Sequence, residues 1–171
     1  MAEVETPPAL LLMAVQDLHD GERAMADRLG TVRGHCSDAA MQSLLDRDER
    51  ESADRKAVLA ALARDLEPDP EDAENIWLRA ILDDAANDAE TIARGRVRDI
   101  ALAGALRKAK QSQRVSYETA LALARDLGMA EAAAQFAAMI ASAEAADAAL
   151  AAALQRLSAQ ACGGGEQRHA N

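Results

Sequence analysis

Residues 97–128 read VRDIALAGALRKAKQSQRVSYETALALARDLG and are the longest stretch of the chain with helical character. Alanine, leucine and arginine, which favour helices, dominate this stretch, and Gly128 stands where a helix commonly ends. Positions spaced alternately three and four apart form the face that a bundle helix buries. That face reads Ala103, Leu106, Lys110, Gln113, Tyr117, Ala120, Ala124 and Leu127. A lysine and a glutamine therefore occupy positions that should point into a core.

The composition predicts an all-α protein. The chain has 171 residues, is rich in alanine, and contains one residue each of Trp, Tyr and Phe. Strand-forming residues are scarce, whereas helix-forming residues are abundant. A chain of this length is expected to fold as one domain with a sizeable core.

Charge and cysteine usage narrow the possible partners and location. The formal net charge of −10 disfavours binding to nucleic acid or to an anionic membrane surface. The apolar run over residues 9–15 is too short to span a membrane. Cys36 and Cys162 are far apart and have no metal-binding or redox spacing. A cytoplasmic location, with no membrane partner and no nucleic-acid partner, is therefore expected.

Five helices are predicted from start and stop signals, the first of which is Thr6 followed by Pro7. The expected ranges are 7 to about 30 or 34, 39–66, 70 to about 87, 97–127 and 130–158. The short third helix lies between two pairs of long ones. This layout predicts a ferritin-like four-helix bundle with a long crossover containing a shorter fifth helix. The bundle domain is expected over 1–158, and a disordered, glycine-rich tail over 159–171.

The buried faces of two other long helices also contain polar residues. On the first helix the face reads Leu11, Val15, Leu18, Glu22, Met25, Leu29 and Val32. On the second it reads Met41, Leu44, Asp48, Glu51, Arg55, Val58 and Leu62, although Leu45, Leu59 and Leu66 offer an alternative face. On the last helix it reads Phe136, Met139, Ala143, Ala146, Leu150, Ala153 and Leu157 and stays apolar. Antiparallel pairing of the helices would bring the polar positions to one level of the bundle.

This polar layer does not contain the residues of a di-metal site. Such a site in a helical bundle takes one Glu from each of two helices and a Glu-x-x-His motif from each of the others. The predicted layer contains Glu22, Asp48, Glu51, Arg55, Lys110, Gln113 and Ala143. A lysine ammonium has three donors and no acceptor, so it would repel a divalent ion. A core of ion pairs without a cofactor is favoured over a metal site.

A reduced metal site is the alternative. Glu22, Asp48 and Glu51, with His19 or Glu144 beside them, could hold one iron or manganese ion weakly.

Three segments resemble the YciE/YciF-like family of bacterial ferritin-like proteins. Residues 11–29 (LLMAVQDLHDGERAMADRL) are similar to the opening helix of that family, whose glutamate falls on Glu22. Residues 97–128 and 131–150 are similar to its last two long helices. The resemblance implies a ferritin-like bundle, often dimeric, that is associated with stress responses and has a di-metal site.

The chain departs from the family at the metal-binding positions. The family sequence VEHYE falls on residues 109–113, so its two glutamates become Lys110 and Gln113. Its last-helix acidic positions fall on 141–144, and a family histidine falls on Asp48. Only Glu22 and Glu51 match family ligands. The di-metal site is therefore expected to be degenerate.

The sequence predicts a non-catalytic, ferritin-like protein, and the resemblance implies an association with stress. No nucleophile–base pair, phosphate loop or basic patch is recognisable, so enzymatic activity is not expected. The metal-binding protein with a reduced site is one alternative. The other is a partner-binding bundle that forms a homodimer through the alanine-rich face of the last helix, residues 143–154 (AEAADAALAAAL).

Overall fold

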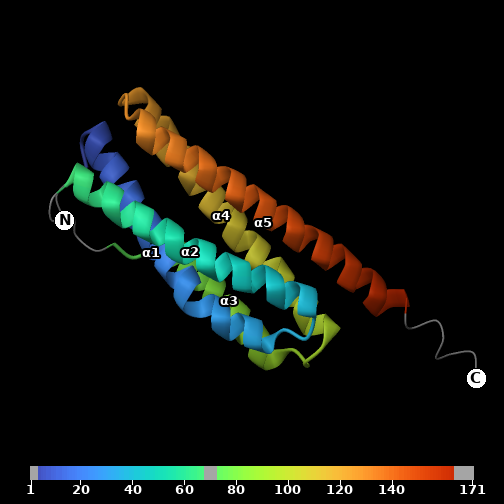
Figure 1. The fold of residues 1–171 in the computed structure, drawn as a ribbon. Coiled ribbons are helices and arrows are strands. Elements are labelled where there is room, and N and C mark those ends of the chain that lie inside the picture. Colours follow the sequence, from blue (N-terminus) through green and yellow to red (C-terminus); the bar gives the residue numbers. More distant parts are fainter. Residues whose placement is uncertain (1–3, 68–72, 164–171) are drawn as a thin grey trace, which may run out of the picture.

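The structure, a computed structural model, describes residues 4–67 and 73–163. These residues form five helices and no strand (Figure 1). The helices are α1 (Pro7–His35), α2 (Ala39–Leu66), α3 (Ile76–Thr91), α4 (Arg96–Asp126) and α5 (Ala130–Gly163). The predicted all-α fold is confirmed.

The four long helices form two antiparallel pairs, α1 with α2 and α4 with α5 (Figure 1). α1 also packs on α4, and α2 packs more loosely on α5. The C-terminal halves of α2 and α4 contribute to the same apolar cluster, so these two helices run parallel across the bundle. The crossover that reverses the chain between them carries α3, which packs on α4 and α1. This is the predicted ferritin-like connectivity.

The predicted helix boundaries hold at most ends. The Thr6 hydroxyl accepts a hydrogen bond from the Ala9 N–H, and Asp38 caps α2 by accepting one from the Met41 N–H. Gly128 has a φ of +71°, the left-handed conformation expected of a glycine that ends a helix.

The start of α3 was predicted too early. The expected start near residue 70 falls in a segment outside the described residues, and the described helix begins at Ile76. Asn75 is its N-cap, because its side chain accepts a hydrogen bond from the Leu78 N–H at 2.8 Å. The start lies against Gly21 of α1, where an added Cβ would approach Leu78 to 3.0 Å. The helix therefore begins where it packs on α1, and a start signal based on proline does not reveal this position.

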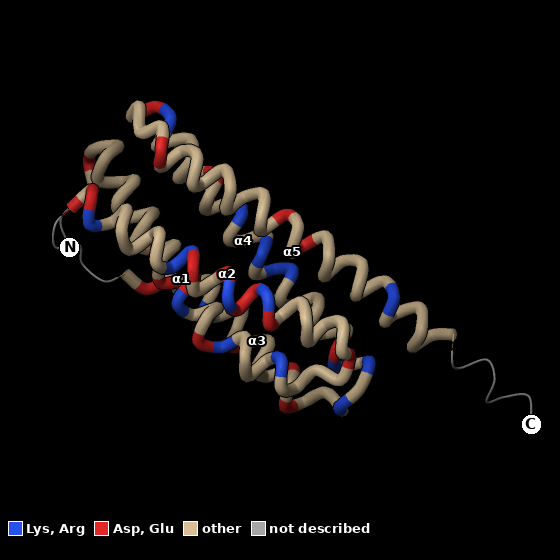
Figure 2. Tube along the Cα trace, in the orientation of Figure 1, with Lys and Arg blue, Asp and Glu red and all other residues tan. Residues whose placement is uncertain are grey.

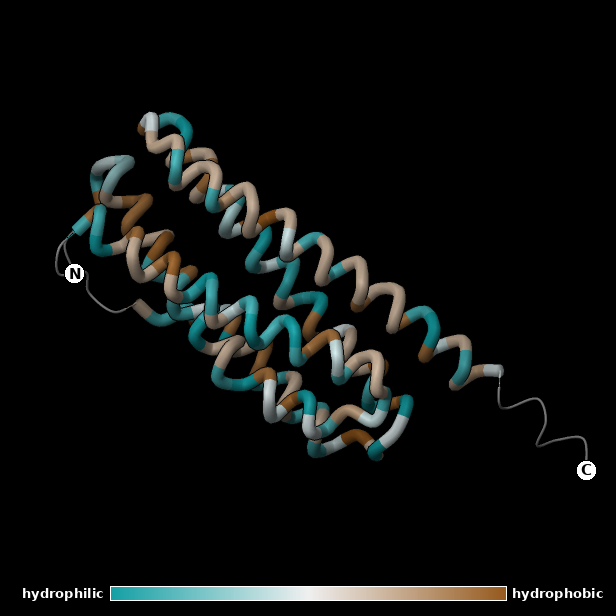
Figure 3. Tube along the Cα trace, in the orientation of Figure 1, coloured by the Kyte–Doolittle hydropathy of each residue, from teal (hydrophilic) through white to brown (hydrophobic). Residues whose placement is uncertain are grey.

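α5 is longer than predicted. It continues to Gly163, so residues 159–163 of the expected tail are helical, and the remaining tail residues lie outside the described part. By length and composition alone α5 could also cross a membrane, since its most apolar window has a mean hydropathy of 1.4. Figure 3 shows this apolar character along α5. Its core-facing residues nonetheless pack inside the bundle.

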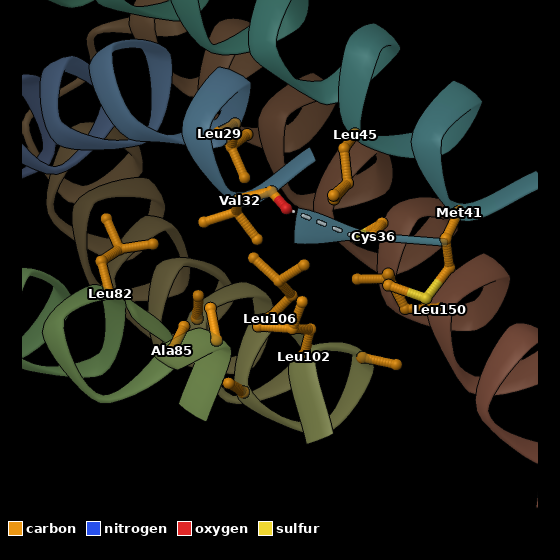
Figure 4. Close-up of a cluster of buried hydrophobic side chains, with 14 of the residues drawn as sticks. Leu29, Val32, Cys36, Met41, Leu45, Leu82, Ala85, Leu102, Leu106 and Leu150 are labelled. Carbon is orange, nitrogen blue, oxygen red and sulfur yellow. Dashed lines mark hydrogen bonds between the residues drawn. The ribbon is translucent and has the colours of Figure 1, made fainter. Parts of the chain in front are cut away.

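The apolar core is divided into two clusters. One cluster joins the C-terminal half of α1 to α3 and the first half of α4, and it includes Leu29, Leu102 and Leu106 (Figure 4). The other surrounds Tyr117 and Phe136 at the opposite end of the bundle. Along each long helix the residues between the two clusters form the middle of the bundle. Figure 2 shows charged residues gathered there on α2 and α4.

The predicted buried face of α2 was rotated from the true one. Leu45, Ser52 and Leu59 are buried, whereas Leu44 and Val58 are only half-buried. The helix therefore turns part of the alternative leucine face inward, while Asp48 remains buried at 6% exposure. The buried face of α2 was predicted wrongly because residues 48–55 are mostly charged. Charged residues lie both on the buried face and beside it, so apolar spacing does not mark the buried face in this run.

Candidate functional site

A layer of polar side chains crosses the middle of the bundle between the two apolar clusters. Glu22 of α1 follows Leu18 of one cluster and precedes Met25 of the other. The remaining members come from α2, α4 and α5, at equivalent points of each helix. The layer consists of Glu22, Asp48, Glu51, Ser52, Arg55, Lys110, Gln113, Tyr117 and Ser142.

Glu22 is the centre of this layer and is fully buried. Its Oε1 atom accepts hydrogen bonds from Arg55 Nε at 3.0 Å, from Gln113 Nε2 at 2.7 Å and from the Tyr117 hydroxyl. Its Oε2 atom is the one buried side-chain oxygen or nitrogen in the described residues that has no hydrogen-bond partner. One carboxylate therefore joins α1 to α2 and α4 through a single oxygen.

Lys110 forms the second link between helices. Its Nζ atom lies 2.7 Å from Asp48 Oδ1 and 3.1 Å from Gln113 Oε1, and the side chain is 1% exposed. The amide of Gln113 thus accepts from Lys110 and donates to Glu22. This orientation of the amide follows from its two partners, because a lysine ammonium only donates and a carboxylate only accepts.

Arg55 supplies the other positive charge. Besides Glu22 Oε1, its guanidinium reaches Asp48 Oδ1 at 3.3 Å and Glu51 Oε2 at 3.4 Å. It also donates to the hydroxyls of two serines, Ser52 at 3.0 Å and Ser142 at 3.1 Å. Burial lowers the pKa of Arg55, but the charge of Glu22 and its hydrogen bond, together with the charges of its other neighbours such as Asp48, outweigh burial and raise it above the usual range. The guanidinium remains charged and ties three carboxylates together.

Tyr117 lies at the boundary between the polar layer and the second apolar cluster. Burial and the neighbouring charge of Glu22 raise the pKa of this phenol well above its usual value. The hydroxyl therefore stays protonated and serves as a donor to Glu22.

Glu51 lies at the edge of the layer, and its side chain is 40% exposed. Its Oε2 atom accepts a hydrogen bond from Ser142 Oγ at 2.9 Å, which links α2 to α5. The prediction that Glu51 points into the core is wrong, because α2 is rotated so that Asp48 and Ser52 take the inner positions.

The predicted site residues come together, except that Glu51 lies at the edge of the layer and Ala143 contributes no polar group. Glu22, Asp48, Arg55, Lys110 and Gln113 belong to one connected network of hydrogen bonds. Ala143 is buried but brings no polar atom to the layer.

The alternative ligands from the sequence lie elsewhere. Glu144 is exposed, 4.0 Å from Arg114, outside the layer. His19 is half-buried, one position off the buried face of α1.

Sequence reasoning missed three members of the layer. Tyr117 appeared only as a core residue, while Ser52 and Ser142 were not singled out. Ser52 could have been found from its spacing, because it follows Asp48 by four residues and precedes Arg55 by three on one helix face. Nothing in the sequence signals that Ser142 faces Glu51 across the bundle.

The donor set does not fit a pair of divalent metal ions. Arg55 and Lys110 place their cationic groups among the carboxylates, where an ion would have to bind. The inward oxygens of Glu22 and Asp48 already accept hydrogen bonds from these cations. No group of three or more His, Cys, Asp or Glu side chains within residues 4–67 and 73–163 is arranged to hold a metal.

Two solved structures have closely similar folds. The E. coli stress protein YciF superposes with a TM-score of 0.85 at 17% identity, covering 90% of this chain and 98% of that protein. YcfI from Rhodopseudomonas palustris superposes with a TM-score of 0.81 at 19% identity, covering 86% of this chain and 94% of that protein. No curated protein matches the chain by sequence.

The match to a family covers nearly the whole chain. Residues 6–162 match the family described as "Domain of unknown function (DUF892)". With the YciF-like fold, this match confirms the resemblance seen in the sequence. The chain belongs to the DUF892 family.

Proposed function

We propose that the protein is a non-catalytic, YciF-type bundle protein in which a buried layer of ion pairs replaces the di-metal site of its ferritin-like relatives. The contact between Lys110 Nζ and Asp48 Oδ1 carries this proposal. A lysine there supplies the positive charge that a metal would otherwise supply to the carboxylates. The similarity in fold to a stress protein supports a role in the stress response.

The layer holds the four long helices in one register. Glu22, Lys110, Gln113 and Ser142 each bond to a group on another helix or link two helices, so sliding one helix would leave buried charges unpaired. An unpaired charge in a core costs several kcal/mol, roughly 3–5 kcal/mol when one partner of a pair is removed. A layer whose charged groups are paired with one another favours a structural or interaction role.

Metal analysis tests the proposal. Protein produced in medium rich in iron and manganese, then purified without chelators, is expected to carry far less than about one metal per chain. About two tightly bound ions per chain would overturn the proposal.

Restoring the family glutamates gives a second, positive test. The double variant Lys110→Glu/Gln113→Glu should bind iron or manganese more tightly than the parent, as measured by calorimetry. Lys108→Glu is the matched control, because Lys108 lies on the same helix and its side chain is 66% exposed. Equal metal affinity in all three proteins would show that Lys110 does not stand in the place of a metal.

A protein that binds one metal weakly is the second candidate. The unpartnered Oε2 atom of Glu22 favours it, since a buried acceptor without a donor can take a water or a cation. Glu22, Asp48 and Glu51 would be its ligands, with iron or manganese as the ion. If Glu22→Ala binds either metal as well as the parent does, this candidate is excluded.

A homodimer is the assembly that we propose for the bundle. The outer face of α5 carries exposed alanines spaced four, three, four, three and four apart, at Ala134, Ala138, Ala141, Ala145, Ala148 and Ala152. This spacing is the same in both directions, so two antiparallel α5 helices related by a two-fold axis would place alanine against alanine. The stripe is about 27 Å long at the rise of an α-helix.

Sedimentation velocity at micromolar concentration tests the dimer. Ala145→Arg places a charge in the middle of the stripe and should give a monomer. Ala53→Arg changes an exposed alanine of α2 and should leave the dimer intact. A monomeric parent would exclude this assembly. A cytoplasmic location remains part of the proposal, since both cysteines are free thiols.

A further inference from the structure

The seam between α2 and α5 is fastened along only part of its length. At one end Arg156 of α5 donates to both carboxylate oxygens of Asp38, at 2.9 and 2.7 Å. In the middle Ser142 bridges Arg55 and Glu51. Beyond Ser142, towards the C-terminus of α2, no hydrogen bond or ion pair joins the two helices in the described residues.

Two adjoining cavities extend from the Ser142 bridge into this unfastened part of the seam. Their volumes are about 440 and 280 Å³, and they share Val58 of α2 and Gln135 of α5 as lining residues. Together they form a groove, the α2/α5 groove, that runs from Glu51 to Asp65 along α2, about 21 Å at the rise of a helix. Its apolar lining includes Val58, Leu62, Met129, Ala132, Ala138 and Met139.

The rim of the groove is acidic. Four carboxylates line it, from Glu51, Asp54, Asp65 and Glu131. Those of Asp54, Asp65 and Glu131 form no hydrogen bond or ion pair with any described residue. The one cation in the lining, Arg55, is already paired with three carboxylates of the buried layer. The groove therefore presents an apolar floor between free negative charges.

We infer that the α2/α5 groove binds an amphipathic helix of a partner protein, with an apolar stripe flanked by lysine or arginine. An apolar groove of this kind accepts the apolar face of a helix, and about four turns match its length. The acidic rim pairs with flanking cations and favours them over acidic helices. The two methionines can adapt to the shape of the incoming side chains.

A second copy of the chain meets this requirement less well at the groove. Its formal net charge is −10, so it offers no excess of cations to pair with the acidic rim. The groove is also distinct from the alanine stripe on the outer face of α5, with which it shares only Ala138. The inference does not depend on whether the buried layer holds a metal.

Binding of designed peptides to the full-length protein tests the inference. The probe is a fluorescein-labelled peptide of about 18 residues, long enough to form a helix, with leucine on one face and lysine on the other. Two controls have the same length: a leucine–glutamate peptide with the same pattern, and a leucine–lysine peptide with a scrambled pattern. Fluorescence anisotropy should show at least about tenfold tighter binding of the patterned lysine peptide than of either control.

Two matched variants locate the binding site. Ala61→Trp fills the groove at an exposed alanine of its wall, and it should weaken binding at least about tenfold. Ala53→Trp changes an exposed alanine of the same helix that lines neither cavity, and it should leave binding unchanged. Circular dichroism checks that both variants are folded.

Charge-reversal variants test the electrostatic contribution to peptide binding. Asp54→Lys should weaken binding, whereas Glu90→Lys, at an exposed position of α3, should affect it little. Equal binding of the patterned and scrambled peptides, or equal binding by both tryptophan variants, would mean only general attraction to an acidic chain and would overturn the inference. A dimer of the protein that Ala61→Trp disrupts and Ala53→Trp does not would assign the groove to a second copy, which also overturns it.

Discussion

The ammonium of Lys110 lies 2.7 Å from the Oδ1 atom of Asp48, and the two side chains join α4 to α2 in the middle of the bundle. Neither group has free access to water, since Lys110 is 1% and Asp48 is 6% exposed. A buried pair of this kind contributes little net stability by itself, but it is costly to break. Each residue therefore needs the other to offset its buried charge, whereas the intact pair adds little to the stability of the fold.

Lys110→Ala should lower the free energy of unfolding by roughly 3–5 kcal/mol, because it leaves Asp48 with only the more distant Arg55 as a charged partner. Urea denaturation measures the change. Lys108→Ala removes an exposed lysine two residues away and should change stability by less than about 0.5 kcal/mol. A neutral effect of Lys110→Ala would mean that the ammonium reaches water in solution.

The phenol of Tyr117 should not ionise near its usual pKa. Burial and the charge of Glu22 raise the pKa of this group in the folded state, and it is the single tyrosine of the chain. Absorbance at the tyrosinate band, followed from neutral to alkaline pH, should stay constant past pH 10 until the protein unfolds. A smooth titration near pH 10 with the protein still folded would contradict the buried position.

The same shift makes stability depend on pH. The folded pKa lies above the unfolded value of about 10, so the contribution of Tyr117 is complete below pH 10 and is lost as the pH rises above it. The free energy of unfolding should then fall by up to about 1.4 kcal/mol per pH unit. In Tyr117→Phe this part of the slope should disappear.

The two cysteines should react at very different rates. Cys36 is buried, and burial together with the charges of Asp99 and Asp38 raises the pKa of its thiol to about 12. Cys162 is exposed near the end of α5. A thiol reagent should label one cysteine quickly in the native protein and the second only after denaturation. Cys162→Ser should abolish the fast phase, and Cys36→Ser should leave it unchanged.

The fold could be predicted further than the details of the site. Apolar spacing and capping residues gave the long helices, because patterns such as Thr6–Pro7 and the glycine at 128 act locally. The layer was also predictable on α1 and α4, where Glu22 and Lys110 interrupt otherwise apolar faces. The rotation of α2 was left open between two faces, one of them marked by Leu45, Leu59 and Leu66, since charged residues stand on both sides of its buried face.

Contacts between segments that are distant in the sequence could not be predicted from the sequence alone. Ser142 donates a hydrogen bond to Glu51, which is 91 residues away in the sequence. Asn75 donates hydrogen bonds to Asp17 and Asp20 of α1, which are 58 and 55 residues away. These partners are set by the angles at which helices pack, and no local pattern encodes them. For the same reason the start of α3 at Ile76 could be identified only from the structure, in which the helix packs on α1.

Asp20 shows how the crossover helix is held. This carboxylate is 1% exposed and accepts hydrogen bonds from the Asn75 N–H at 2.8 Å and from Arg79 Nε at 2.7 Å, both at the start of α3. Burial raises the pKa of Asp20, but the bonds from Arg79, from Asn75 and from Arg23 outweigh burial and lower it below the usual range. The charged form of Asp20 therefore stabilises the docking of α3 on α1.

Asp20→Asn should lower the free energy of unfolding at neutral pH by about 2–3 kcal/mol, since hydrogen bonds to a charged group are lost or weakened. The folded pKa is below the unfolded value of about 3.9, so this contribution is present above pH 4 and is lost as the pH falls below it. The difference between parent and variant should accordingly shrink in acid. Hydrogen exchange should show faster exchange in α3 of the variant, whereas Asp65→Asn, at an exposed and unpaired position, should match the parent. Unchanged exchange in α3 would mean that apolar contacts alone, such as that of Leu78, hold the crossover in place.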